Sequence, residues 1–226
     1  MQTVSGRMED NMKVLITGTS RGIGRAVAQR FLEQGHTVIG MDREPSAITS
    51  PEYCHMILDI LQDPLPDLNG VNILINNAGV QNTGMDIDIN LKGTIRITEK
   101  YGVQPEIRSI LFIASASAST GAEFPEYAAS KGGVVTYMKN TAQRIAPFGA
   151  TANSLSPGGV ITALNDHILN DPVLWEAVLK ETLLSKWMTL EEVADWAYFM
   201  TVTNKSMTAQ DILVDNGEAA RFNFIW

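Results

Sequence analysis

Short apolar runs alternate with amphipathic segments along most of the chain. The first runs, KVLITG, TVIGMD, HMILDI and VNILINNAG, are rich in Val, Ile and Leu, and GIGRAVAQRFLEQG between the first two has helical apolar spacing. Because the runs are apolar on both sides, we expect strands that are buried on both faces, as in a parallel sheet covered by helices.

The same alternation continues through the second half of the chain. We expect helices at about 86–101, 125–145, 172–184 and 190–201, and strands at 109–114, 150–155 and 211–214. Strands that alternate with helices through right-handed crossovers build a doubly wound sheet. The predicted fold class is therefore α/β, a mostly parallel sheet of the Rossmann type between two layers of helices.

A single domain is the simplest organisation for 226 residues, of which 45% are hydrophobic. The sequence contains no linker, repeat or low-complexity segment that would divide it. We expect a flexible polar leader over residues 1–11 and one domain over residues 12–226. About a dozen residues separate Asp59 from the strand at Val71, so any helix between them is limited to a turn or two.

Charge and cysteine content exclude several classes of function. Seventeen Lys and Arg residues against 25 Asp and Glu give a net charge of -8, without a basic run that could neutralise a row of phosphates. The single Cys54 excludes an internal disulfide, and no Cys/His spacing resembles a zinc site. No segment approaches the roughly 18 apolar residues of a membrane span. We therefore expect a cytoplasmic protein that binds no nucleic acid, membrane or metal.

The stretch TGTSRGIG, residues 17–24, follows the first strand and opens the first helix. Its glycines allow a tight turn, close approach of the backbone to a pyrophosphate and close helix packing, and the helix N-terminus offers amides to phosphates. An ordinary strand-to-helix turn is the alternative, because the spacing is G-x-x-x-G-x-G. The candidate cofactor contacts in this loop are Gly18, Ser20, Arg21, Gly22, Ile23 and Gly24.

Acidic and amide residues follow the next strands. Asp42 closes the second strand, where a carboxylate can accept hydrogen bonds from both adenosine ribose hydroxyls and repels a 2'-phosphate. NAD is therefore favoured, although Arg21 and Arg43 keep NADP possible. Asp59, at the end of the predicted third strand, could meet the adenine edge or simply form a turn. Asn77, Ala78 and Gly79 finish the fourth strand and are candidates to line the cofactor, a structural turn being the alternative.

Tyr127 and Lys131 are four residues apart on a predicted helix, so their side chains face the same way. A fixed ammonium stabilises a phenolate and lowers the phenol pKa from its usual value of about 10. Such a tyrosine could donate a proton to a carbonyl oxygen or accept one from an alcohol. An isolated pair of this kind is usually accidental, but this one follows a strand that ends in a serine cluster.

Together, TGTSRGIG, Asp42, NNAG, Asn90 within DINLKG, the serine cluster, YAASK and NSLSPGGVIT resemble the short-chain dehydrogenase/reductase family in its compact form. The resemblance covers about residues 12–217. It implies a dinucleotide-binding Rossmann domain with a substrate lid at about 163–187, and hydride transfer between NAD(P) and a secondary alcohol or ketone. It also implies a small-molecule substrate and assembly as a homodimer or homotetramer.

The resemblance also implies roles for single residues. Tyr127 is the general acid/base, and Lys131 lowers its pKa and holds the nicotinamide ribose. Asn90 shapes its helix and holds a water that links Lys131 to solvent, although an amide that only bonds neighbouring backbone is the alternative. The loop beside the nicotinamide contributes Pro157, Gly158, Val160 and Thr162.

The choice among the serines rests on spacing. The family usually has a glycine six positions after the catalytic serine, and Gly121 then selects Ser115, provided that the one-residue shortening between serine and tyrosine lies after Gly121. If the strand continued, Ser115, Ser117 and Ser119 would share one face, each about 6 to 7 Å further along. We therefore expect Ser115 to bind the substrate oxygen, with Ser117 as the alternative and Ser119 in a loop.

Three departures from the family pattern bear on assembly and on the C-terminal end. The interval from Gly79 to Asn90 is about half the usual one, which leaves tetramer formation by the usual route open. The sequence VDNG replaces the familiar V-D-G-G, and Asn216 is expected to preserve the turn because Asn tolerates the left-handed conformation. The apolar end FNFIW is expected to pack on its own fold or on a neighbouring subunit.

Two other functions fit parts of the pattern. A catalytically silent regulatory or scaffold protein would keep the dinucleotide fold, but it would have no need of Asn90, Ser115, Tyr127 and Lys131 together. A sugar epimerase or dehydratase of related fold would ordinarily need a longer substrate domain. We therefore expect an oxidoreductase.

Overall fold

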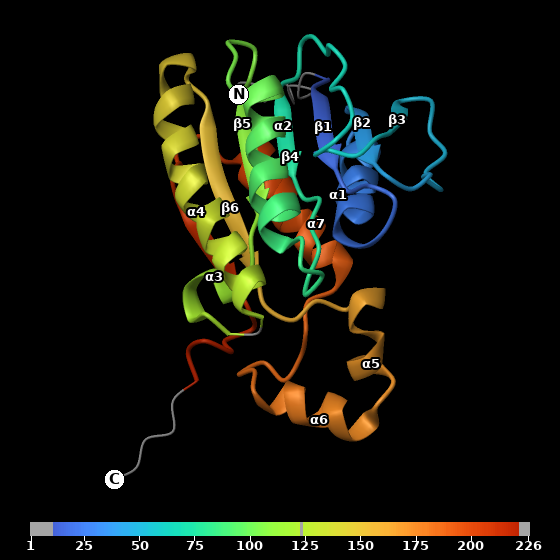
Figure 1. Ribbon diagram of the computed structural model, residues 1–226, viewed down its shortest axis with the longest axis vertical. Helices are drawn as coiled ribbons and strands as arrows, with labels where there is room; N and C mark the ends of the chain where they lie inside the picture. Colours follow the sequence, from blue (N-terminus) through green and yellow to red (C-terminus); the bar gives the residue numbers. More distant parts are fainter. Residues whose placement is uncertain (1–10, 123, 222–226) are drawn as a thin grey trace, which may run out of the picture.

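The apolar runs pair in parallel to form one seven-stranded sheet (Figure 1). The computed structural model describes residues 11–122 and 124–221. The strand order is β3-β2-β1-β4-β5-β6-β7. The strands are β1 (Lys13–Thr17), β2 (Thr37–Asp42), β3 (Tyr53–Ile57), β4 (Ile73–Asn76), β5 (Ser109–Ile113), β6 (Thr151–Pro157) and β7 (Asp211–Val214).

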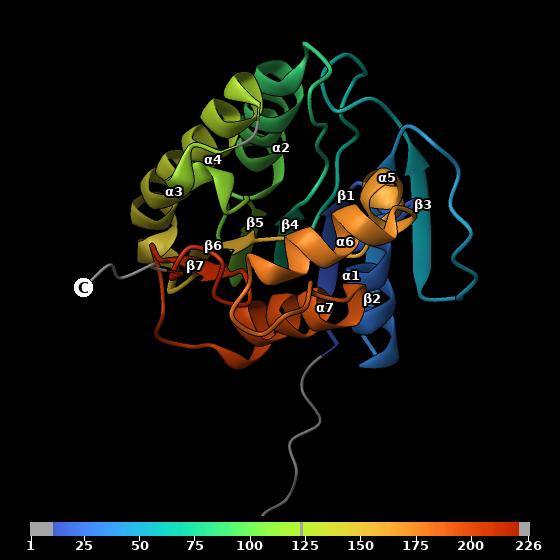
Figure 2. The same ribbon diagram turned by 90° about the horizontal axis from the view of Figure 1, so that it is seen from below.

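Helices cover both faces of the sheet (Figure 2). The helices α1 (Gly22–Glu33) and α7 (Leu190–Tyr198) lie on one face, and α2 (Thr94–Tyr101) and α4 (Pro125–Ile145) lie on the other. Leu15 and Ile16, neighbours on β1, belong to two different buried apolar clusters, as expected for a strand with both faces covered. The predicted three-layer α/β architecture is confirmed.

Shorter helical segments complete the chain. Single helical turns or short helices are α3 (Ser117–Thr120), α5 (Asp166–Leu169), α6 (Pro172–Lys180) and the 3-10 turns Ala146–Phe148 and Ala163–Asn165. Two π-helical segments, Ile87–Gly93 and Phe199–Thr203, precede α2 and follow α7. The helix predicted at 86–101 is therefore a π-helical segment that continues as α2.

The third strand lies earlier in the sequence than predicted. It ends at Ile57, so Asp59 lies beyond the strand instead of ending it. Leu58 and Ile60 are buried although they follow the strand, because they fill the core beneath the loop. Leu58 and Ile60 are apolar because they are buried in the core, and not because they belong to a strand. The connection to β4 begins with a turn in which the Asp63 amide donates to the Asp59 carbonyl oxygen at 3.1 Å.

Residues 161–187 form a single segment outside the sheet, and the residues on either side of this segment are paired with each other. Val160 and Met188 form a parallel bridge, and the Ile161 amide donates to the Met188 carbonyl oxygen at 2.9 Å. Between these residues, α5 and α6 lie at the bottom of the view in Figure 1, beyond the ends of the strands. The segment predicted as a lid therefore projects from the edge of the sheet where β5 and β6 end.

No helix within residues 11–122 and 124–221 is long and apolar enough to cross a membrane. Most of the expected polar leader and the apolar end FNFIW lie outside these residues, so the expectations about them stay predictions. The VDNG turn lies within them: Asn216 has a φ of 56°, the left-handed conformation that we expected.

Candidate active site

The glycine-rich loop between β1 and α1 has the backbone conformation that its sequence demands. Gly18 and Gly22 have φ values of 78° and 55°, which other residues rarely adopt. A Cβ atom on Gly24 would lie 2.0 Å from the Gly18 carbonyl oxygen, so α1 touches the loop. A Cβ atom on Gly22 would meet no described atom within 4 Å, so the backbone there faces open space. An open backbone at a helix N-terminus fits a pyrophosphate.

Two side chains tie this loop to the end of β4. The Thr17 hydroxyl oxygen accepts hydrogen bonds from the amides of Asn77 and Ala78, each at 3.0 Å. The Asn77 side chain donates to the carbonyl oxygens of Thr17 and Gly18 at 2.9 and 3.1 Å. The predicted Asn77 corner therefore supports the glycine-rich loop directly. Thr17 was missed by sequence analysis, and its only signal was a polar residue at the end of an apolar strand.

Asp42 holds the other rim of the loop. Its carboxylate accepts from the Ser20 amide at 2.9 Å and from the Glu44 amide at 3.1 Å. Arg43, whose side chain is 62% exposed, lies 3.9 Å from Asp59. Asp59 accepts from the Leu61 amide at 2.7 Å, which is the turn role left open for it. Asp42 thus places an acidic acceptor beside the loop, while Asp59 caps a turn.

Lys131 is buried, with 6% of its surface exposed, although it is a lysine. Helix α4 carries it to the end of β5, where its Nζ donates to the Ile113 carbonyl oxygen at 2.9 Å. The same Nζ lies 5.7 Å from the centre of the Tyr127 ring, as the spacing of four residues predicts. Burial lowers the pKa of Lys131 to about 8, because removal from water disfavours the charged form.

Asn90 joins the loop after β4 to helix α4. Its Oδ1 accepts from the Val80 amide at 2.8 Å, and its Nδ2 donates to the Val80 carbonyl oxygen and to the Ser130 hydroxyl, each at 2.9 Å. Ser130 in turn donates to the Tyr127 carbonyl oxygen at 2.7 Å. Asn90 is therefore connected to the backbone that carries Tyr127. Ser130 was missed, although it lies three residues after Tyr127 within YAASK.

Gly79 brings the loop after β4 close to both of these side chains. A Cβ atom on Gly79 would lie 3.0 Å from Asn90 Oδ1 and 3.6 Å from Lys131 Nζ. Asn77, two residues earlier, contacts the glycine-rich loop. The two predicted halves of the site, dinucleotide and chemical, are therefore neighbours at one edge of the sheet.

The serine cluster does not continue the strand. β5 ends at Ile113, and the chain turns into α3 at Ser117. The Ser117 amide donates to Ser115 Oγ at 3.2 Å, and the two hydroxyl oxygens lie 3.0 Å apart. Both serines are buried, whereas Ser119 is exposed. The separation of 6 to 7 Å per step, which would hold if the strand continued, does not apply here because it requires an extended backbone.

The loop after β6 starts beside these serines. The Ala116 amide donates to the Pro157 carbonyl oxygen at 2.9 Å. The Gly158 amide donates to the Val214 carbonyl oxygen at 3.0 Å. Val160 and Thr162, the other predicted contacts in this loop, lie where residues 161–187 leave the sheet. The loop predicted beside the nicotinamide therefore begins next to the serine turn.

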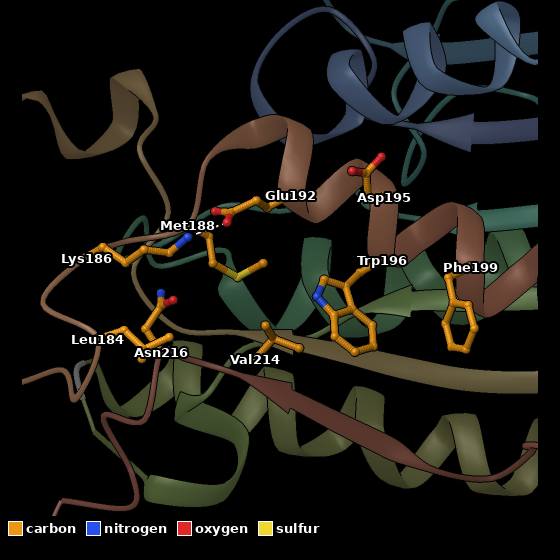
Figure 3. Close-up of a pocket in the computed structure, with 9 residues that line it drawn as sticks. All are labelled: Leu184, Lys186, Met188, Glu192, Asp195, Trp196, Phe199, Val214 and Asn216. Carbon is orange, nitrogen blue, oxygen red and sulfur yellow. Dashed lines mark hydrogen bonds and ion pairs between the residues drawn. The ribbon is translucent and has the colours of Figure 1, made fainter.

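A cavity of about 510 Å³ lies elsewhere, between α7 and β7. Figure 3 shows Trp196 of α7 and Phe199 of its π-helical continuation pointing toward β7, with Val214 and Asn216 to the left of them. The residues that line this cavity include no predicted catalytic or cofactor-binding residue. The volume of this cavity therefore does not locate the active site. The hydrogen-bonded residues described above are the better evidence for its position.

Known proteins resemble the chain over most of its length. A family model described as Enoyl-(Acyl carrier protein) reductase matches residues 48–218, and a second, described as short chain dehydrogenase, matches residues 12–53. The 3-oxoacyl-(acyl-carrier-protein) reductase FabG of Chlamydia pneumoniae is 30% identical, over 91% of this chain and 96% of that protein.

Solved structures share the fold. The aldohexose dehydrogenase of Thermoplasma acidophilum has a TM-score of 0.82 at 24% identity, over 96% of this chain and 97% of that one. The gluconate 5-dehydrogenase of Burkholderia cenocepacia, in complex with NADP and tartrate, has a TM-score of 0.81 at 22% identity, over 96% and 98%. At these identities the likeness establishes the fold.

Proposed function

Because the chain belongs to the short-chain dehydrogenase/reductase family of NAD(P)-dependent oxidoreductases, we propose that Tyr127 is the general acid/base for its hydride transfer. The substrate is a secondary alcohol or ketone. The observation that carries the proposal is the buried Lys131 ammonium beside the Tyr127 ring, at the edge of the sheet where the glycine-rich loop lies.

Each side chain at this edge has a defined task. Bound nicotinamide supplies or accepts the hydride. The Tyr127 hydroxyl donates a proton to the carbonyl oxygen during reduction and accepts it from the alcohol during oxidation. The positive charge of Lys131 stabilises the phenolate that remains. The Ser115 hydroxyl donates a hydrogen bond to the substrate oxygen and so orients it. Asn90 fixes α4 relative to Gly79.

A charged lysine in this position favours an enzyme over a silent dinucleotide-binding protein. Burial of an ammonium costs free energy, as the lowered pKa of Lys131 reflects. A scaffold protein would gain nothing from that cost, whereas an acid/base tyrosine requires a nearby positive charge. The same reasoning explains why Asn90 and Ser130 brace the helix that carries both groups.

The direct test is the variant Tyr127→Phe, which removes one oxygen and keeps the ring. We expect NADH affinity within about twofold of wild type, and hydride transfer lowered by at least about 10²-fold, the usual contribution of a general acid/base. Nicotinamide absorbance would be followed over a panel of ketones, 3-oxoacyl thioesters and polyols. Wild-type turnover by this variant would exclude Tyr127 as the acid/base.

NAD is the proposed cofactor, in preference to NADP. Asp42 presents a carboxylate at the rim of the loop, where it would pair with ribose hydroxyls and repel a 2'-phosphate. Arg21 and Arg43 are exposed and are the groups that could favour NADP instead. The related gluconate 5-dehydrogenase structure contains NADP, so a direct comparison of NADH and NADPH affinity is the appropriate measurement.

We also propose that the chain forms a homodimer or homotetramer and is cytoplasmic. Support for assembly comes from β7, which is an edge strand, and from the exposed apolar side chains of Leu184, Phe199 and Leu213 around it. The free, exposed Cys54 suits a reducing compartment. Light scattering gives the mass of the assembly, and fractionation of the host cell gives its location.

A further inference from the structure

A chain of hydrogen bonds runs under the glycine-rich loop through residues to which the proposed function assigns no role. Thr19 Oγ1 lies 2.9 Å from Tyr53 Oη, and Tyr53 Oη lies 2.8 Å from His55 Nδ1. His55 Nε2 lies 2.8 Å from the Glu44 carbonyl oxygen. These contacts connect β3, the edge strand next to β2 in Figure 2, to both sides of the loop.

The direction of each bond follows from the chemistry of its last acceptor. A carbonyl oxygen only accepts, so His55 Nε2 carries the proton. In a neutral imidazole Nδ1 is then an acceptor, and Tyr53 must donate to it. The Tyr53 oxygen in turn accepts from Thr19, whose side chain is fully buried. Each of the three donors in the chain therefore has an acceptor.

Both ends of this chain lie on the groups that form the proposed adenosine site. Thr19 stands between Gly18 and Ser20 in the glycine-rich loop. The Glu44 carbonyl oxygen also accepts from the Ser20 hydroxyl at 2.7 Å, and the Glu44 amide donates to Asp42 at 3.1 Å. His55 therefore holds the carbonyl group of the same residue, Glu44, whose amide donates to the Asp42 carboxylate.

Gly40 on β2 provides the space for this arrangement. A Cβ atom there would lie 2.2 Å from Tyr53 Oη and 2.4 Å from Thr19 Oγ1. Tyr53 and His55 point to the same face of β3, because they are two residues apart, and Cys54 between them is exposed. Two apolar side chains in place of Tyr53 and His55 would pack against β2 without the matched hydrogen bonds of Thr19, Tyr53 and His55.

We propose that Tyr53 and His55 are positioning residues for the adenosine half of the dinucleotide. Tyr53 holds Thr19 and His55 holds the backbone at Glu44, so that Asp42 meets the ribose without reorganisation. The inference rests on the proposed binding of NAD(P) at the glycine-rich loop. It deepens that proposal by adding two residues on the edge strand β3 to the determinants of cofactor affinity.

The experiment compares two Tyr→Phe variants by fluorescence titration with NADH and by competition with ADP-ribose, which contains the adenosine half alone. Tyr53→Phe should weaken both ligands by about tenfold, the equivalent of about 1.4 kcal/mol and typical of one buried hydrogen bond. Tyr137→Phe is the matched control, because it also loses one hydrogen bond, which Tyr137 on α4 donates to Glu99 on α2. It should leave both affinities unchanged.

A second variant and a spectroscopic measurement keep the test independent of folding defects. His55→Leu should weaken NADH and ADP-ribose to a similar extent, whereas Cys54→Ser should not. The ¹⁵N chemical shifts of His55 should identify the Nε2-protonated tautomer. Wild-type affinities in folded Tyr53→Phe or His55→Leu, or the opposite tautomer, would overturn the inference. Failure of the wild-type protein to bind either NADH or NADPH would instead refute the proposed function.

Discussion

The hydroxyl oxygens of Ser115 and Ser117 lie 3.0 Å apart at the end of β5. The Ser117 amide also donates to Ser115 Oγ, so the Ser115 oxygen already accepts one hydrogen bond. Its proton is left to donate, either to Ser117 or to a substrate oxygen. We therefore expect one serine to bind the substrate while the other fixes its orientation.

This geometry predicts unequal effects of two alanine substitutions. Ser115→Ala should lower hydride transfer by about 10²-fold, because it removes a donor to the developing charge on the substrate oxygen. Ser117→Ala should lower it by about tenfold or less, and exposed Ser119→Ala is the control that should change nothing. Steady-state rates at saturating NADH measure all three. If Ser117→Ala lowered hydride transfer more than Ser115→Ala did, Ser117 would be the serine that binds the substrate oxygen.

The buried charge of Lys131 is expected to lower the stability of the protein while it supports activity. The pKa of Lys131 is about 8 in the folded protein, below the ordinary lysine value of 10.5, so between these pH values the folded protein binds fewer protons at this group than the unfolded protein does. The free energy of unfolding of the wild type should therefore increase as pH rises from 8 to 10.5. The increase should be about 3 kcal/mol at most. In Lys131→Met that contribution disappears, and hydride transfer is lost.

Urea denaturation at pH 7 and pH 10 checks this prediction. The stability of Lys131→Met relative to wild type should be higher at pH 7 than at pH 10, because only the wild type contains a buried charge at the lower pH. The hydrogen bond to Ile113 is lost at both pH values, so the sign of the difference between them reports the buried charge. A relative stability that stays constant between the two pH values would contradict the assignment.

Asp42 predicts the cofactor preference. Asp42→Asn removes the negative charge, so the ratio of NADPH to NADH affinity should rise by about tenfold or more. Asp59→Asn is the matched control, since Asp59 caps the turn at Leu61 and should leave the preference unchanged. Titration of both variants with both cofactors gives the ratios. An altered preference in Asp59→Asn would restore the adenine-edge role for that residue.

The sequence predicted most strands, α4 and the neighbourhood of the site because burial on both faces leaves a strong apolar pattern. It misplaced β3, since an edge strand is half exposed while Leu58 and Ile60 beyond it are buried. It also could not show that Ser117 turns back onto Ser115, because parity along a strand does not reveal where the strand ends.

Residues missed entirely have roles that depend on long-range contacts. Thr17 acts on Asn77, and Tyr53 acts on Thr19, a residue 34 positions away in the chain. Nothing local in the sequence distinguishes such a threonine or tyrosine from an ordinary strand residue. The catalytic candidates were found because they recur as a family pattern, whereas these supporting residues depend on the fold itself.

The surface around β7 predicts how the chain assembles. Trp196 and Phe199 form an edge-to-face pair, 37% and 46% exposed, beside an edge strand whose Leu213 is 39% exposed. Phe199→Asp should therefore lower the mass measured by light scattering, because a charge would be buried in the subunit contact. Phe148→Asp is the matched control, since Phe148 is 40% exposed but lies after α4. A wild-type monomer at micromolar concentration, or an equal loss of mass in the control, would contradict an interface formed by α7 and β7.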